Sequence, residues 1–165
     1  MRYSFLFLAV VFISTSVKCD EIPKVIDSFG TKYVSACLPK TEIELKAKII
    51  KLAGHRKPSQ AWKLVHVLLC EKNKAAERYA ITHMAERVLV DEFFTGSDDA
   101  NDSAPTYVDR NVNLMMKGRA WGVSAVSWKP NTIEINTLDA GCATGIALRF
   151  FKNNWLLTEV ASACD

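Results

Sequence analysis

The cysteines, read together with the N-terminus, constrain this chain more than any other sequence feature. Residues 1–19 have the pattern of an export signal: Arg2 supplies a positive charge, residues 5–13 are an unbroken apolar run, and small residues follow. Cleavage fits after Ser16 or after Cys19. The second site leaves four cysteines, an even number that predicts two disulfides in an exported chain. We therefore expect a secreted or periplasmic protein.

Size and charge narrow the class of protein. Removal of the signal leaves residues 20–165, a length typical of one domain with a substantial core. It also leaves 19 basic residues against 18 acidic ones, a net charge of about +1. This balance gives no electrostatic basis for binding nucleic acid. No segment after the signal reaches the roughly 18 continuous apolar residues of a membrane span.

The first half of the mature chain has helical periodicity. Apolar residues at spacings of four, three, four and four predict a helix over residues 22–37. The capping box Thr41-x-x-Glu44 begins a second helix that ends at Gly54. Third and fourth helical stretches are expected after Pro58 and over residues 74–94.

The second half favours strands, after a polar loop over residues 95–106. Alternating or β-branched segments predict strands at residues 107–116, 119–128, 132–137, 144–151 and 155–163. In residues 132–137 the alternation predicts Ile133 and Ile135 inward, and Thr132, Glu134 and Asn136 outward. The expected fold class is α+β, with N-terminal helices packed on a C-terminal antiparallel, curved sheet. Because the strands need the helices as a covering layer, we expect a single domain.

The last two strands allow a prediction of their register. If residues 152–154 form a three-residue loop, Phe151 faces Trp155 and Cys142 faces Cys164. Directly opposed side chains are close enough for a disulfide. The register therefore predicts a Cys142–Cys164 bond.

The same register predicts which side chains share a face. It places the following residues on the apolar face: Cys142, Ile146, Leu148, Phe150, Leu156, Val160 and Cys164. Trp155 and Leu157 are expected on the opposite face. By elimination, the second predicted disulfide joins Cys37 to Cys70.

No sequence pattern predicts catalysis, a metal or a cofactor. His66 and Cys70 have metal-ligand spacing on a helix, but a second ligand pair is missing and Cys70 is expected in a disulfide. With all four mature cysteines paired, no thiol remains for nucleophilic chemistry. Phosphate-binding and dinucleotide-binding glycine patterns are also missing.

Aromatic residues in the predicted sheet are the strongest indication of a binding surface. The candidate binding residues are Trp121, Trp128, Arg149, Phe151 and Trp155. Both faces of these strands are fairly apolar, and one layer of helices covers only one face. The sheet could curl around a pocket or meet a partner with its second face, and the alternative is that the remaining helix and long side chains cover that face.

The closing hairpin, residues 146–160, resembles that of the nuclear-transport-factor-two-like superfamily, whose members end with an apolar strand, a polar turn, a tryptophan and an alternating strand. The order of helices before sheet is similar as well. The resemblance implies a cone-shaped fold with a curved sheet around a pocket. Enzymes of the superfamily use Asp, His and Tyr in that pocket, and none of their motifs maps onto this chain.

The leading functional hypothesis is an exported, disulfide-stabilised, non-enzymatic binding module for a protein partner: an inhibitor, an immunity protein or an interaction protein. The alternative is a small-ligand pocket protein or an acid–base enzyme. Its candidate groups would be the carboxylates of Asp109, Asp139 and Glu159 and the phenol of Tyr107.

Overall fold

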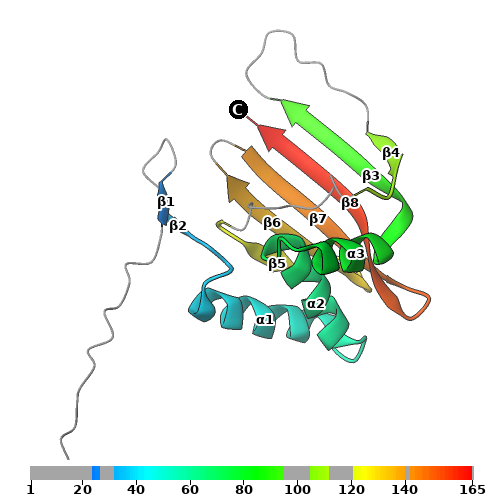
Figure 1. Cartoon of the computed structure of the whole chain (residues 1–165), viewed down its shortest axis with the longest axis horizontal. Coiled ribbons are helices and arrows are strands. Elements are labelled where there is room, and N and C mark those ends of the chain that lie inside the picture. The colour runs from blue at the N-terminus through cyan, green and yellow to red at the C-terminus, as the bar shows by residue number, and fades with distance from the viewer. Residues whose placement is uncertain (1–23, 27–31, 95–104, 112–120, 140–141, 165) are drawn as a thin grey trace, which may run out of the picture.

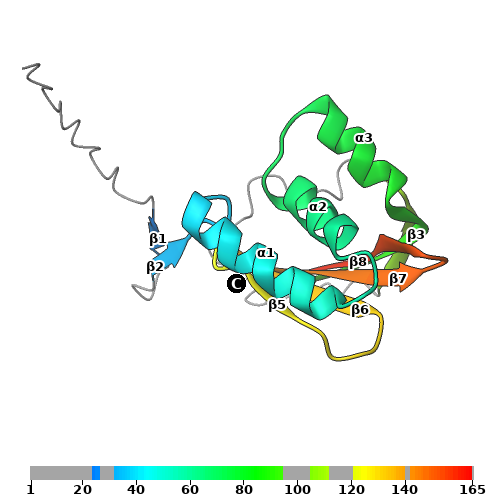
Figure 2. The same ribbon diagram turned by 90° about the horizontal axis from the view of Figure 1, so that it is seen from below.

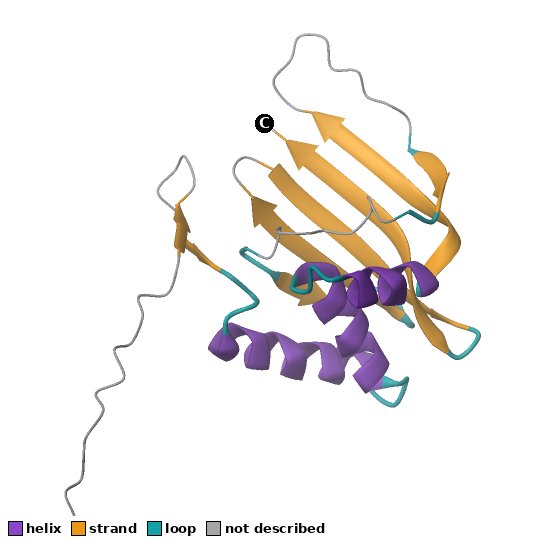
Figure 3. Ribbon diagram, viewed as in Figure 1, coloured by secondary structure: helices purple, strands orange, loops and turns teal. Residues whose placement is uncertain are grey.

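The computed structural model describes residues 24–26, 32–94, 105–111, 121–139 and 142–164 (Figure 1). In these residues the helices are α1 (Pro39–Ala53), α2 (Pro58–Leu69) and α3 (Lys74–Thr82). The strands are β1 (Lys24–Ile26), β2 (Lys32–Val34), β3 (Met84–Phe94), β4 (Thr106–Asp109), β5 (Ser124–Val126), β6 (Thr132–Asp139), β7 (Cys142–Phe151) and β8 (Asn154–Cys164). Helices before a sheet confirm the predicted α+β class (Figure 3).

The described strands form a six-stranded sheet in the order β4-β3-β8-β7-β6-β5, and a separate pair, β1-β2. Neighbouring strands of the main sheet are antiparallel except β3 and β8, which are parallel. The sheet is therefore mixed, whereas an antiparallel sheet was expected. The helices pack on one face of it (Figure 2), which we call the covered face. The opposite face is the outer face.

The core lies between α2 and the covered face of β6, β7 and β8. Ile133 and Ile135 of β6 are fully buried there, which confirms the predicted inward direction of both side chains. In β8, Trp155 and Leu157 are also fully buried. The buried residues of α2 are Ala61, Leu64, Val65, Val67, Leu68 and Leu69. This continuous apolar layer anchors the sheet and leaves its outer face for other contacts.

The helix predicted over residues 22–37 is wrong in the described part of that range. β1 and β2 pair there as antiparallel strands, with Lys24 opposite Val34. The apolar spacing matched a helix, but Val25 and Ile26 are β-branched, as is Val34, and such residues pack well in strands. The local preference of these side chains prevails over the apparent helical stripe.

The fourth helical stretch, predicted over residues 74–94, is half correct. α3 ends at Thr82, and β3 follows from Met84. Val88 and Val90 are β-branched and lie two residues apart, a spacing that suits a strand. β3 is thus the strand that brings a parallel pairing into the sheet.

The start of α1 also differs from the expected capping box. The helix begins at Pro39, with Leu38 in the capping position. The Thr41 hydroxyl donates to the carbonyl oxygens of Ser35 and Leu38 instead of capping the helix. Proline explains the shift, because its fixed φ and missing N–H suit the first helical position.

The Asn73 side chain caps α3. Its Oδ1 accepts a hydrogen bond from the backbone N–H of Ala76 at 2.9 Å. We expect Asn73→Ala to lower the free energy of unfolding by about 1 kcal/mol, because a free helix N–H loses its partner. Asn73→Ser keeps a capping oxygen without adding a charge next to Glu71, whose carboxylate accepts from the Asn73 side chain at 3.1 Å, and should stay close to wild type in urea unfolding. An equal loss for both variants would show that the cap is not the cause.

The strand ends differ from the expected ranges in two further places. β4 spans residues 106–109 and overlaps the strand expected at 107–116 only at residues 107–109, and residues 112–116 lie outside the described residues. β5 covers residues 124–126 of the expected 119–128. Most of the predicted loop at 95–106 also lies outside the described residues.

The closing hairpin has a tighter turn than expected. Phe151 faces Asn154, and Phe150 faces Trp155. Lys152 and Asn153 have φ of 45° and 64°, as a two-residue turn between twisted strands requires. The expected three-residue loop is therefore wrong.

A bulge in β8 restores the expected register further along the hairpin. The pairing shifts by one residue between Ala147 and Leu148, and beyond the shift Ile146 faces Val160. Cys142 consequently faces Cys164, as predicted. Two deviations of one residue each, a shorter turn and a bulge, cancel at the cysteines but not near the turn.

The structure contains the predicted disulfide between Cys37 and Cys70, with Cα atoms 5.5 Å apart. It ties the segment before α1 to the end of α2. Cys142 is also disulfide-bonded. Its position opposite Cys164 in the register agrees with the predicted second bond, whose pairing stays a prediction.

Candidate functional site

A row of directly paired residues crosses the outer face of the sheet from edge to edge. In strand order from β4 to β5, it consists of Tyr107, Leu89, Glu159, Ala147, Glu134 and Val126. Residues that face each other across neighbouring strands share one side of a sheet. Glu134 and Glu159 therefore stand on either side of Ala147, two strands apart.

The outer face is recessed at its centre, because the side chains there are small. Along β7, Gly145 and Ala147 lie between the longer side chains of β6 and β8. A Cβ atom at Gly145 would lie 3.0 Å from the Asn136 Oδ1, so glycine keeps this space open. The floor formed by small residues explains why the outer face is hollowed here.

Two adjoining hollows of about 290 and 230 Å³ occupy this region, and we call them together the outer trough. Both are lined by Glu134, Ala147 and Glu159. The larger hollow adds Lys129, Pro130, Thr132, Arg149 and Thr158, and the smaller adds Asn136, Gly145, Ile146 and Ala161. Glu134 and Glu159 therefore line both hollows, whereas the basic Lys129 and Arg149 line only the larger one.

Exposed aromatic side chains lie around the trough. Phe151 follows Arg149 on the outer face of β7 and is 54% exposed. Tyr107, at the β4 end of the paired row, is 58% exposed. Trp128 is 73% exposed, and its loop is joined to the end of β7 by a hydrogen bond from the Phe150 N–H to the Asn131 carbonyl at 2.7 Å.

The structure brings together only part of the predicted binding set. Trp128, Arg149 and Phe151 lie at one end of the sheet, near the two turns. Trp121 lies at the other end of β6, where its carbonyl accepts from the Leu138 N–H at 2.9 Å.

Trp155 is fully buried in the core, so its predicted place on a binding surface is wrong. The reason is the two-residue turn. A one-residue change of register moves a side chain to the opposite face, and near the turn it carries Trp155 and Leu157 inward. Leu156, expected inside, pairs instead with the exposed Arg149.

The three acid–base candidates whose side chains are described, Tyr107, Asp109 and Glu159, do not lie together. Tyr107 and Glu159 share the outer row but stand two strands apart, with Leu89 between them. Two strand spacings correspond to about 9.5 Å. Asp109 lies further along the β4 edge, opposite Arg87. The side chain of Asp139 lies outside the described residues.

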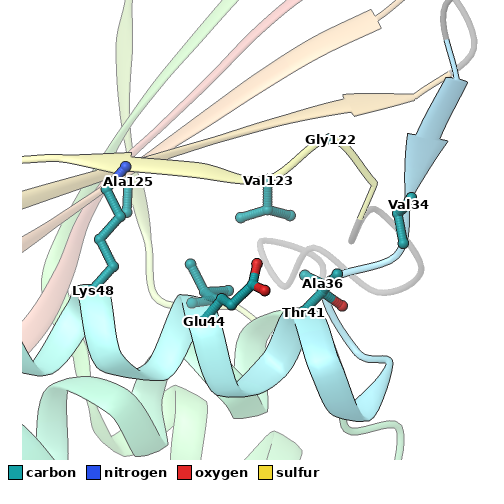
Figure 4. A pocket seen from close by; sticks show the side chains of 9 residues that line it. Val34, Ala36, Thr41, Glu44, Lys48, Gly122, Val123 and Ala125 are labelled. Atoms are coloured by element: carbon teal, nitrogen blue, oxygen red, sulfur yellow. The ribbon is translucent and has the colours of Figure 1, made fainter.

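A separate hollow of about 290 Å³ lies between α1 and β5 (Figure 4). Its apolar lining comes from Val34, Ala36, Leu45, Val123 and Ala125, and Thr41 and Gly122 complete it. Glu44 and Lys48 extend from α1 toward β5 at this hollow, and both are exposed to solvent. The volume is at the lower limit of small-molecule sites.

The described residues hold no group of three or more His, Cys, Asp or Glu side chains arranged to bind a metal ion. The His66 ring is engaged by two carboxylates, with Nε2 3.5 Å from Glu42 Oε1 and Nδ1 3.2 Å from Glu71 Oε1. Cys70 is in the disulfide. None of the described helices combines the length and apolarity that crossing a bilayer requires.

Sequence reasoning missed Glu134 as a candidate site residue and did not consider Lys129. A usable signal was present for Glu134, because the alternation in residues 132–137 already placed it outward. No sequence pattern predicted that Glu134 and Glu159 lie on either side of the same residue of β7. That arrangement depends on β6, β7 and β8 lying in spatial order, which the hairpin register alone does not reveal.

Comparisons with known proteins gave matches only among solved structures. No protein-family model matches the chain, and neither does any curated protein. A DUF4783 family protein from Bacteroides ovatus has a TM-score of 0.39 at 12% identity, covering 68% of this chain and 98% of that one. One from Bacteroides uniformis has a TM-score of 0.38 at 7% identity, covering 66% and 97%.

A further matched structure bears NTF2 in its name, with a TM-score of 0.36 at 12% identity, covering 73% of this chain and 98% of that one. At these scores the matches carry no assignment of activity, substrate or partner.

Proposed function

We propose that this chain is an exported, disulfide-stabilised binding module that contacts a protein partner through the outer face of its sheet. The observation that carries the proposal is the asymmetry of the sheet. Among the described residues, the helices pack on one face, while the other holds the trough and the exposed aromatic rings of Tyr107 and Phe151. Aromatic residues and arginine are enriched at protein interfaces.

Two features support the exported part of the proposal. Residues 1–19 have the pattern of a signal peptide. The Cys37–Cys70 disulfide is of a kind that persists in oxidising compartments and is rare in the cytosol. A single interaction face on a cross-linked scaffold suits an inhibitor or immunity-type protein, because a preorganised surface loses little entropy on binding.

Site-specific photo-crosslinking tests the position of the interface. A benzoylphenylalanine at position 151 should give adducts with a protein from the native exported fraction. The matched control is the same probe at Ile43, which is 68% exposed on α1 and belongs to the other side of the molecule. Adducts from position 43 and none from position 151 would contradict an outer-face interface.

Substitutions at the exposed rings test the energetics. We expect the double variant Trp128→Ala/Phe151→Ala to weaken binding of the cross-linked partner by about tenfold or more, since exposed aromatic anchors dominate interface energies. Binding is measured by surface plasmon resonance with the purified, oxidised chain. Unchanged affinity together with wild-type unfolding would overturn the assignment of these rings.

A further inference from the structure

We propose that the protein partner presents an acidic surface to one end of this molecule, which we call the basic end. The basic end consists of the loop between α1 and α2, the loop between β5 and β6, and the β7–β8 turn with the residues beside it: residues 54–57, 127–131 and 149–154. It includes Arg149 and Phe151 of the outer face. The inference rests on the proposed function and specifies the charge of the surface that the partner presents.

Hydrogen bonds join the three segments of the basic end, which lie at the same end of the molecule (Figures 1 and 2). The Phe150 N–H donates to the Asn131 carbonyl at 2.7 Å, which joins the second segment to the third. The Asn154 side chain accepts from Lys57 Nζ at 3.4 Å and from Gln60 Nε2 at 3.1 Å, which joins the third segment to the first and to the start of α2. The three segments therefore form one surface, although they are far apart in the sequence.

The basic end has a large excess of positive charge. Its segments contain five of the 19 basic residues of the signal-free chain and none of its 18 acidic ones: Arg56, Lys57, Lys129, Arg149 and Lys152. The rest of that chain therefore has 14 basic residues against 18 acidic ones, although the whole is nearly neutral. This separation of charge favours an acidic surface at the basic end, because complementary potentials speed and orient the docking of two proteins.

Carboxylates of the molecule itself do not neutralise the basic end by direct contact. None of its five cationic side chains forms an ion pair within the described residues. Glu134 and Glu159 line the larger hollow together with Lys129 and Arg149. Even with these two carboxylates counted, positive charges outnumber negative ones by five to two. The lysine and arginine side chains thus remain available to carboxylates of a partner.

Two exposed rings at the basic end favour a protein surface over a purely ionic partner. Trp128 is 73% exposed and Phe151 is 54% exposed. Lys152 Nζ lies 5.4 Å from the centroid of the Phe151 ring, so charge and ring are presented together. Tryptophan and arginine are enriched among the residues that dominate interface energies, and phenylalanine is enriched in interfaces. The acidic surface of the partner therefore also offers apolar contacts.

The probe for this chemistry is a capped acidic peptide with two apolar residues, Asp-Glu-Phe-Asp-Leu-Glu-Asp, added to the oxidised chain and followed by NMR. The neutral reference peptide is Asn-Gln-Phe-Asn-Leu-Gln-Asn. We expect the acidic peptide to shift the Trp128 indole N–H signal and the amide signals of Lys129 and Lys152. The neutral peptide should bind at least about fivefold more weakly. Added salt should weaken binding of the acidic peptide, because it screens exposed charges.

Two matched lysine variants locate the interaction. Lys129→Gln/Lys152→Gln should weaken binding of the acidic peptide by about fivefold and leave binding of the neutral peptide unchanged. The control is Lys40→Gln/Lys46→Gln, which removes two exposed lysines of α1 outside the basic end. The control variant should bind the acidic peptide as wild type does.

Three outcomes would overturn the inference: no shifts at the basic end with millimolar peptide, equal binding of the acidic and neutral peptides, or an equal loss in the two lysine variants. Vesicles of phosphatidylcholine and phosphatidylglycerol provide a fourth. If they bind more tightly than the acidic peptide and depend on the same two lysines, the basic end is a lipid-binding surface and the inference is wrong.

The cross-linking at position 151 separates this inference from the proposed function. Adducts there, without a preference for the acidic peptide, would overturn the inference and leave an outer-face partner of different chemistry. Adducts from position 43 alone would contradict the proposed interface itself.

Discussion

Trp155→Ala is expected to lower the free energy of unfolding by about 3–5 kcal/mol, the range for loss of a large buried ring. The Trp155 side chain is fully buried, and its ring centroid lies 5.3 Å from that of Phe150. Its indole N–H donates to the Arg56 carbonyl, and its backbone N–H donates to Gln60 Oε1 at 3.1 Å. The substitution thus opens a cavity and removes a link between the closing hairpin and the start of α2.

The matched control is Trp128→Ala, which removes the same side chain from a position 73% exposed. We expect its unfolding free energy to stay within about 0.5 kcal/mol of wild type. Urea unfolding followed by far-ultraviolet circular dichroism measures both variants. A loss at Trp155→Ala no larger than that at Trp128→Ala would contradict the burial of Trp155 in the core.

Removal of the Cys37–Cys70 bond is expected to have an effect of similar size. The two cysteines are 33 residues apart in sequence. For a loop of this length, the chain-entropy model gives a loss of about 3–4 kcal/mol in the free energy of unfolding. We expect Cys37→Ala/Cys70→Ala to show that loss in urea unfolding, because the unfolded chain regains the freedom that the bond removes.

The variant leaves Cys142 unchanged, so it separates one cross-link from the other. Wild type treated with dithiothreitol should be no more stable than oxidised Cys37→Ala/Cys70→Ala. Any additional loss of stability in the reduced wild type gives the contribution of the disulfide at Cys142. A variant as stable as oxidised wild type would contradict a stabilising role for the Cys37–Cys70 bond.

The sequence predicted elements well where one local signal dominated. The helix expected after Pro58 is present as α2, which begins at Pro58 itself, and clean alternation placed Ile133 and Ile135 in the core. Prediction failed where two local signals disagreed. A helical spacing of apolar residues coincided with β-branched side chains around β1, and again in β3 after α3 had ended.

The closing hairpin shows how a correct result can follow from a partly wrong argument. The expected turn was one residue too long, and the bulge in β8 was not anticipated, yet Cys142 does face Cys164. The predicted register differs from the observed one only between the turn and the bulge. There it placed Trp155 on the surface, although it belongs to the core.

For the candidate site, individual residues could be predicted but their grouping could not. Arg149 and Phe151 were selected from the sequence, and both lie on the outer face at the trough end of β7. Glu134 became their neighbour only through the order of the strands in the sheet. Trp121, which looked equivalent in sequence, lies at the opposite end of β6.

By itself, the sequence determined the α+β class, the core-facing residues of β6 and the Cys37–Cys70 cross-link. The first two follow from hydrophobic periodicity, which is a property of short stretches of sequence. The cross-link follows by elimination, because only two cysteines remain once Cys142 is paired with Cys164. Only the tertiary structure decided the parallel pairing of β3 with β8, the burial of Trp155 and the pair of carboxylates in the trough. Each of these depends on which strands become neighbours and in what register. That choice is made by packing the whole sheet against the helices, and no local pattern encodes it.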